Sequence, residues 1–164
     1  MKTSTLILLM FVGFLTYNVT AQETIWFDAN WKETNKENAE YYRPTPKKQD
    51  NGFWIIDYYK NGNVQMEGFS KTNVPHEEKF DGLVLYYHKN GKPFHKANYK
   101  NGVLDGVRKV FYESGDLKEQ GKYKEGKRDG IWKTFYKNGK IETKGKYRNG
   151  EKVGVWKTFY KNVY

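Results

Sequence analysis

A unit of 24 residues recurs along this chain, and this fixed period constrains the fold more than any other feature. One copy begins at Gly106 and the next at Gly130, and the aromatic and glycine positions stay in register between them. Earlier copies begin near residues 52 and 82, and a partial copy begins near residue 154. The positions that define the unit are Gly106, Gly121, Trp132, Tyr136, Gly139, Gly145, Tyr147 and Trp156. The period predicts a repeat architecture.

Each unit has the pattern of a β-hairpin. Two runs of aromatic and β-branched residues flank an Asn-Gly or Ser-Gly pair, which favours a two-residue type I′ turn. A turn of this kind at 138–139 pairs Tyr136 with Ile141 and places Trp132 opposite Gly145, where the glycine leaves room for the indole. A three-residue loop with a bulge is the alternative, and it would exchange the face assignments.

A single hairpin buries too little apolar surface to be stable, so neighbouring units must continue the sheet. We therefore expect an all-β fold, an elongated single-sheet array of antiparallel hairpins with a small N-terminal cap. The expected organisation is a signal peptide at 1–21, a cap segment at 22–51 and a hairpin-repeat domain at 52–164. Val163 and Tyr164 are expected to belong to a closing strand.

The N-terminal residues have the composition of a secretory signal peptide. Lys2 supplies the positive charge, residues 6–15 form a short apolar core, and Val19-Thr20-Ala21 is a small-residue cleavage site. A buried N-terminal helix is the alternative. The chain has no cysteine, so an exported product would be held without disulfides. We expect a bacterial protein of the periplasm or the secreted fraction.

Two segments interrupt the repeat pattern. Residues 22–49 predict a short strand at 24–27, then one or two helical turns around 34–40, which together cap the edge of the first hairpin. A peptide-binding arm is the alternative for this segment. Residues 71–79 are an insertion after the first repeat, and such a loop either contributes to binding or is a tolerated surface excursion.

The formal net charge is +10, and part of it falls along the second strand of each unit. Strand alternation predicts a basic stripe on one face, formed by Lys118, Lys122, Lys124, Lys140, Lys144, Lys146 and Arg148. Such a stripe would attract an acidic protein or anionic lipid head groups. A solvated face kept charged for solubility is the alternative. Single-stranded nucleic acid is disfavoured because an exported protein would not meet it.

No group of residues in the sequence supports catalysis. Asp81, Asp105 and Asp129 recur just before the repeat glycine, which indicates a role in turns. His76-Glu77-Glu78 lacks the second histidine of a zinc-protease helix, and the sequence has no nucleophile elbow or phosphate loop. We expect no enzyme activity, no cofactor, no metal and no small-molecule substrate.

The quoted pattern of Gly, Trp, Tyr and Gly resembles the MORN-repeat variant family from about Gly52 to Tyr160. This resemblance implies a hairpin array used as a binding or scaffold surface. Bacterial members are often labelled YwqK-type antitoxins, which implies neutralisation of a partner toxin. The pattern departs at Val84 and Arg108, which replace tryptophan, and at Ala97 and Val163, which replace glycine. The leading hypothesis is an exported scaffold that binds a protein partner at the cell envelope. The alternatives are an immunity protein and a peripheral binder of anionic membranes.

Overall fold

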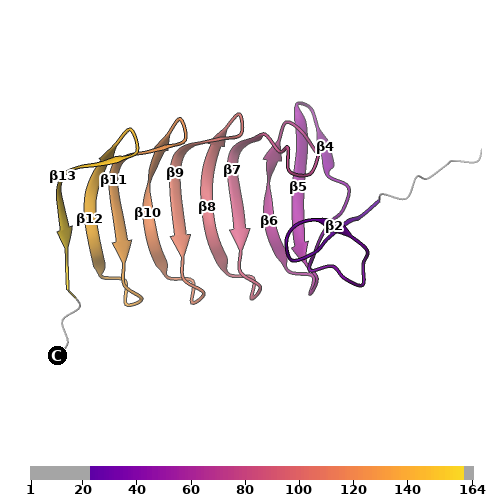
Figure 1. The fold of residues 1–164 in the computed structure, drawn as a ribbon, viewed down its shortest axis with the longest axis horizontal. Coiled ribbons are helices and arrows are strands. Elements are labelled where there is room, and N and C mark those ends of the chain that lie inside the picture. Colours follow the sequence, from indigo (N-terminus) through magenta and orange to yellow (C-terminus); the bar gives the residue numbers. More distant parts are fainter. Residues whose placement is uncertain (1–22, 161–164) are drawn as a thin grey trace, which may run out of the picture.

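The computed structural model describes residues 23–160. Within these residues all the regular secondary structure is β-strand (Figure 1). The strands are β1 (Ile25–Phe27), β2 (Glu33–Thr34), β3 (Tyr41–Arg43), β4 (Lys47–Gln49), β5 (Gly52–Tyr59), β6 (Val64–Ser70), β7 (Phe80–Tyr87), β8 (Pro93–Lys100), β9 (Val103–Phe111), β10 (Leu117–Lys124), β11 (Lys127–Phe135), β12 (Ile141–Arg148) and β13 (Glu151–Thr158). The expected signal peptide at 1–21 and the expected closing-strand residues Val163 and Tyr164 lie outside the described residues.

The strands form one antiparallel sheet of 13 strands, which confirms the predicted array. From β5 to β13, each strand pairs with its neighbours in the sequence, so the sheet grows by one hairpin per repeat. Figure 1 shows these strands side by side along the long axis, with β13 at one end and the N-terminal strands at the other. The array is one layer deep, so each repeat contacts only its neighbours.

The N-terminal segment extends the sheet instead of forming a helix. β3 and β4 pair with β5, and β1 pairs with both β3 and β2. The predicted strand at 24–27 is confirmed as β1, whereas the helical turns predicted around 34–40 are wrong. Glu33 and Thr34 pair with β1, and the side chain of Asn35 accepts a hydrogen bond from the Asn38 amide at 3.1 Å in a following turn. Asparagine favours such turns over helix interiors.

The turns within the hairpins differ from the predicted type I′ turn. Tyr136 and Lys140 close a three-residue loop, because the Tyr136 amide donates to the Lys140 carbonyl at 2.9 Å. Within this loop only Gly139 has a positive φ, of 80°, whereas type I′ requires two such residues. The type I′ turns lie instead between repeats, as at Asn101 and Gly102, whose φ angles are 51° and 82°. The predicted two-residue turn at 138–139 is therefore wrong, and the alternative, a three-residue loop with a bulge, is confirmed.

A β-bulge compensates for the extra loop residue. Phe135 pairs with Ile141 and Thr134 pairs with Thr143, so Glu142 has no partner on β11. The predicted pair of Tyr136 with Ile141 is therefore wrong, whereas the predicted pair of Trp132 with Gly145 is confirmed. The equivalent bulges in the two preceding hairpins fall at Phe94 and Lys118. A bulge places its extra side chain where strict alternation does not predict it.

The hydrophobic core lies on the sheet face that carries Trp132, which we name the aromatic face. Its centre is the buried cluster of Ile55, Met66 and Val84, with Phe80 and Tyr86 packed around it. The insertion at 71–79 is a loop closed by a hydrogen bond from the Lys71 amide to the Lys79 carbonyl at 3.0 Å. The opposite face of the array we name the lysine face, for the residues described below.

Candidate functional site

Large and small residues alternate across the aromatic face, one to each strand. The row runs through Ile55, Gly68, Val84, Ala97, Arg108, Gly121, Trp132, Gly145 and Trp156. A Cβ atom at Gly121 would fall within the indole of Trp132, and one at Gly145 would fall within the indole of Trp156. Each glycine therefore makes room mainly for the tryptophan of the next repeat, not for the one in its own hairpin. Ala97 faces Arg108, so the alanine occurs where the tryptophan is also missing.

Tyrosine hydroxyls link successive repeats along the same face. The Tyr112 hydroxyl donates to the Phe135 carbonyl at 2.7 Å, and the Tyr136 hydroxyl donates to the Phe159 carbonyl at 2.8 Å. His88 occupies the equivalent position one repeat earlier, and its buried Nε2 atom has no hydrogen-bond partner. The hydroxyl groups of Tyr112 and Tyr136 therefore link each repeat to the next.

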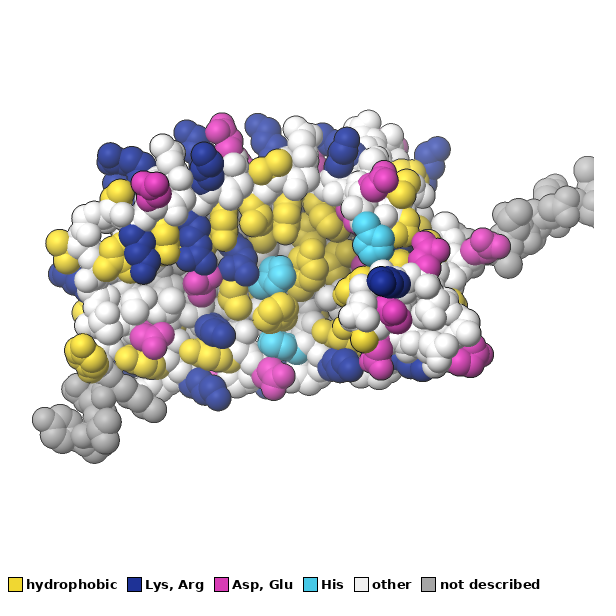
Figure 2. Space-filling model, viewed as in Figure 1, with side chains coloured by type: hydrophobic (Ala, Val, Ile, Leu, Met, Phe, Trp, Pro, Cys, Tyr) yellow, Lys and Arg dark blue, Asp and Glu magenta, His cyan; other side chains and the backbone are white. Residues whose placement is uncertain are grey.

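The arginines on the aromatic face are paired with carboxylates. Arg108 Nη1 lies 2.9 Å from Glu119 Oε1, and Arg128 Nη2 lies 3.6 Å from Glu119 Oε2. The Arg128 guanidinium also stacks on the indole of Trp132, 4.2 Å from the ring centroid, and donates to the Tyr147 hydroxyl. Figure 2 shows this face, where acidic and basic side chains lie around a hydrophobic centre with the histidines among them. The face is thus occupied mainly by its own packing.

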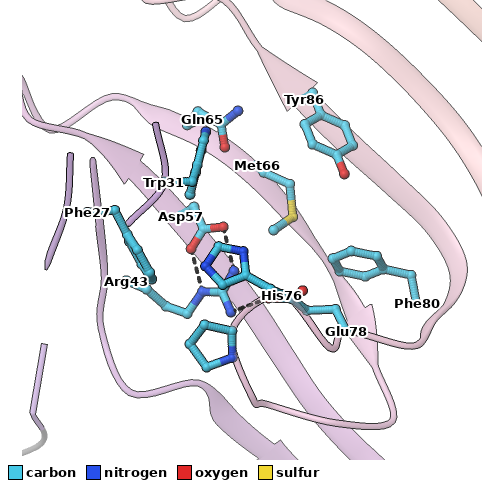
Figure 3. A pocket seen from close by; sticks show the side chains of 11 residues that line it. Phe27, Trp31, Arg43, Asp57, Gln65, Met66, His76, Glu78, Phe80 and Tyr86 are labelled. Atoms are coloured by element: carbon cyan, nitrogen blue, oxygen red, sulfur yellow. Dashed lines mark hydrogen bonds and ion pairs between the residues drawn. The ribbon is translucent and has the colours of Figure 1, made fainter. Parts of the chain in front are cut away.

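A cavity of about 210 Å³ lies on the aromatic face where the N-terminal segment meets the insertion (Figure 3). Arg43 forms two hydrogen bonds to Asp57, at 2.6 and 2.8 Å, and a third to Glu78 of the insertion at 2.6 Å. Burial raises the pKa of Asp57 above its ordinary value, and the Arg43 guanidinium offsets part of this. The insertion is therefore fixed to the cap by a charge network that the sequence did not predict.

Aromatic and sulfur-containing side chains form the rest of the cavity wall. Phe27 and Trp31 come from the cap, and Phe80 and Tyr86 come from β7. His76 approaches Phe27 edge-on, with the ring centroids 6.0 Å apart, and it has a φ angle of 67°. Because Arg43 directs its donors to Asp57 and Glu78, the polar groups of the cavity mainly satisfy one another (Figure 3). This arrangement joins cap and insertion, and it offers few free groups for chemistry.

The predicted basic stripe is only partly on one face. Lys122, Lys124, Lys144, Lys146 and Arg148 follow strand alternation and lie opposite the aromatic face. Lys118 and Lys140 do not belong to this set. Lys118 is the bulge residue of β10, and its ammonium lies 5.5 Å from the ring centroid of Tyr112 on the aromatic face. Lys140 closes the hairpin loop, next to the start of β12. The seven predicted residues therefore do not form a single stripe, because only five of them lie on the face opposite the aromatic face.

The lysine face carries a straighter basic feature, which we name the lysine row. It crosses six adjacent strands, β8 to β13, with one residue from each: Lys96, Lys109, Gln120, Lys133, Lys144 and Lys157. Lys144 is paired directly with Lys133 on one side and with Lys157 on the other. Adjacent members are about 4.8 Å apart, the spacing of strands in a sheet. Of this row, the sequence analysis identified only Lys144, because the alignment depends on the strand register.

A second row on the lysine face is aliphatic and exposed, and we name it the aliphatic row. It consists of Leu83, Val107, Ile131 and Val155, spaced 24 residues apart, with exposed fractions of 46%, 39%, 51% and 79%. Along their own strands, these four residues lie two positions before Leu85, Lys109, Lys133 and Lys157, respectively. Leu85 pairs with Lys96, so it continues the line of the lysine row onto β7. The 24-residue period itself is the signal that could have identified this row in advance.

The lysines of the row have no acidic partners among the described residues. None of the ion pairs within residues 23–160 involves Lys96, Lys109, Lys133, Lys144 or Lys157. Like charges directly opposite each other destabilise a sheet. The lysine face therefore combines uncompensated positive charge with exposed apolar side chains, which a binding partner of opposite charge would satisfy.

Comparison with known families supports the repeat assignment. Residues 80–101, 104–125 and 128–149 match the model of the MORN repeat variant. Repeats of this kind are commonly scaffolds that bind proteins or membranes, and the match is to the repeat unit without any antitoxin specificity. No curated protein matches the chain.

Two further findings concern residues 23–160. No cluster of three or more histidine or acidic side chains there is arranged to hold a metal ion. The same residues include no helix with the length and apolar character needed to span a membrane.

Proposed function

We propose that this protein is a non-enzymatic, exported scaffold that binds an acidic protein partner at the bacterial cell envelope through its lysine face. The observation that carries the proposal is the lysine row, in which Lys133, Lys144 and Lys157 lie side by side without carboxylate partners. The arginines of the aromatic face, in contrast, have acidic partners within the fold. Export rests on the signal-peptide pattern of residues 1–21.

The experiment is affinity capture from envelope extract with mature protein from Gln22 onward. A test variant replaces Lys109, Lys133 and Lys144 by glutamine. A matched control replaces Lys118 and Lys137, whose ammonium groups lie over the Tyr112 ring on the aromatic face, and Lys140, which closes the hairpin loop. The two variants remove the same total charge. We expect wild type and control to retain the same partner and the test variant to lose it. Equal capture by the test variant, or loss by the control alone, would refute a role for the lysine face.

Peripheral binding to anionic membranes is the second candidate. The aliphatic row beside the lysines supports it, because apolar side chains enter the head-group region while lysines attract anionic lipid. Co-sedimentation with anionic and neutral vesicles at low and high salt tests this candidate. Salt-sensitive binding to anionic vesicles alone, lost in the lysine-face variant, would support it. Equal binding to neutral vesicles would contradict it.

A further inference from the structure

We infer that the partner segment recognised by the lysine face is an acidic amphipathic α-helix that lies along the array, across strands β7 to β13. This inference rests on the proposed function, because it specifies the partner of the same face. It is carried by the spacing of two rows in register, the lysine row and the aliphatic row.

The spacing of residues in the lysine row is close to the rise of an α-helix per turn. Its members recur about every 4.8 Å across the strands, and an α-helix rises about 5.4 Å per turn. A helix with one carboxylate per turn on one stripe would thus bring an acid near each position of the row. The row spans five strand intervals, or roughly 24 Å, which corresponds to about 16 residues of helix. The flexible lysine side chains accommodate the small mismatch that accumulates over this length.

The spacing of residues in the aliphatic row is close to the rise of seven residues of α-helix. Leu83, Val107, Ile131 and Val155 lie on alternate strands, so they recur about every 9.6 Å. Seven residues of helix rise about 10.5 Å. The two rows lie two residues apart along each strand, which sets them roughly 7 Å from each other. A helix with an apolar residue at every seventh position, beside its acidic stripe, would contact both rows at once.

The paired rows favour a helix over other anionic partners. A flexible polyanion would satisfy the lysines but leave the aliphatic row exposed. A lipid surface would satisfy both rows without any dependence on spacing. A helix alone uses both the charge of the lysine row and the separation of the aliphatic residues, in the helix-in-groove manner of many peptide complexes. Its binding would therefore depend on the order of residues in the peptide.

The test uses the mature protein and synthetic peptides of about 18 residues, with affinity measured by fluorescence anisotropy and helix formation by circular dichroism. The designed peptide carries Glu once per turn and Leu at every seventh position of the neighbouring stripe. A scrambled peptide of equal composition and poly-glutamate are the comparison ligands. We expect the designed peptide to bind roughly tenfold or more tightly than the scrambled one and to become helical when bound.

Variants of the protein show which row acts. Replacing Lys109, Lys133 and Lys144 by glutamine should abolish binding, and replacing Lys118, Lys137 and Lys140 should leave it unchanged. Ile131→Ser should weaken the binding of the designed peptide several-fold and leave the binding of poly-glutamate unchanged. Equal affinity for the designed and scrambled peptides would overturn the inference, as would tight competition by poly-glutamate or by anionic vesicles.

The outcomes also separate this inference from the proposed function. If envelope capture depends on the lysine face but the designed peptide has no advantage over the scrambled one, the scaffold proposal stands and the helix inference fails. If capture does not depend on the lysine face, both fail.

Discussion

The indole of Trp132 packs over Gly121, at a position where the Cβ atom of any other residue would overlap the ring. Gly121 belongs to one hairpin and Trp132 to the next, so this contact is a joint between repeats. The Trp132 side chain is only 2% exposed although the sheet is a single layer. The joint therefore contributes directly to the stability of the array.

Gly121→Ala should lower the free energy of unfolding by about 1–3 kcal/mol, because the added methyl group forces the indole from its site. Chemical denaturation measures this cost. The same substitution in a Trp132→Arg background should cost much less, since the chain itself places Ala97 beside Arg108. An equal cost in both backgrounds would show that the indole is not the cause.

His88→Tyr should stabilise the protein by about 0.5–1.5 kcal/mol, the usual net value of one hydrogen bond. A tyrosine there would donate to the carbonyl of Phe111, as Tyr112 donates to that of Phe135 one repeat later. Tyr112→Phe should destabilise by a similar amount, and Tyr160→Phe, at a side chain that is 85% exposed, should change nothing. Thermal unfolding of the three variants tests the contribution of these hydrogen bonds between repeats, and a destabilised His88→Tyr variant would contradict it.

Arg43→Met should cost about 3–5 kcal/mol, because it leaves the carboxylate of Asp57 buried without its partner. Arg43→Met combined with Asp57→Leu should recover much of the loss. Glu78→Gln should cost less, since the Glu78 side chain is 13% exposed. Denaturation curves at neutral pH compare the variants. If the single Arg43 variant were as stable as the double variant, the ion pair would not hold the cap.

The stability of the protein should fall as the pH drops from about 6.5 towards about 4. Burial, with a smaller contribution from Arg108, lowers the pKa of His95 from 6.5 to about 4. Between these values the unfolded chain binds a proton that the folded chain does not, so acid favours unfolding. His95→Gln should flatten this part of the curve of Tm against pH. An unchanged slope in that variant would assign the acid sensitivity to other groups.

The repeat period predicted the hairpins, their order and the pairing of Trp132 with Gly145, because aromatic and glycine positions recur in register. It did not predict the turn types. A three-residue loop followed by a bulge preserves the central register of a two-residue turn, so the sequence pattern is compatible with both. The exchange of faces expected for the three-residue loop therefore does not occur. The bulge also explains why Lys118 lies on the aromatic face, since it breaks the alternation on which that prediction depended.

The contacts that join the cap to the insertion were beyond prediction from the sequence. Arg43 and Glu78 are far apart in the chain, and neither belongs to the repeat, so no periodic signal connects them. The lysine row was missed for a related reason. Lys133, Lys144 and Lys157 become neighbours only through the register of three strands, and that register depends on bulges the sequence does not mark.

The most direct test of the account is the stability and the binding of Lys144→Glu, measured together. Glutamate at this position would face Lys133 and Lys157, so two repulsive cross-strand pairs would become attractive. Cross-strand pairs contribute about 0.2–1 kcal/mol each. We therefore predict a higher free energy of unfolding together with loss of partner capture, whereas Lys140→Glu in the hairpin loop should change neither. A Lys144→Glu variant that is less stable than wild type, or that still captures the partner, would contradict the account.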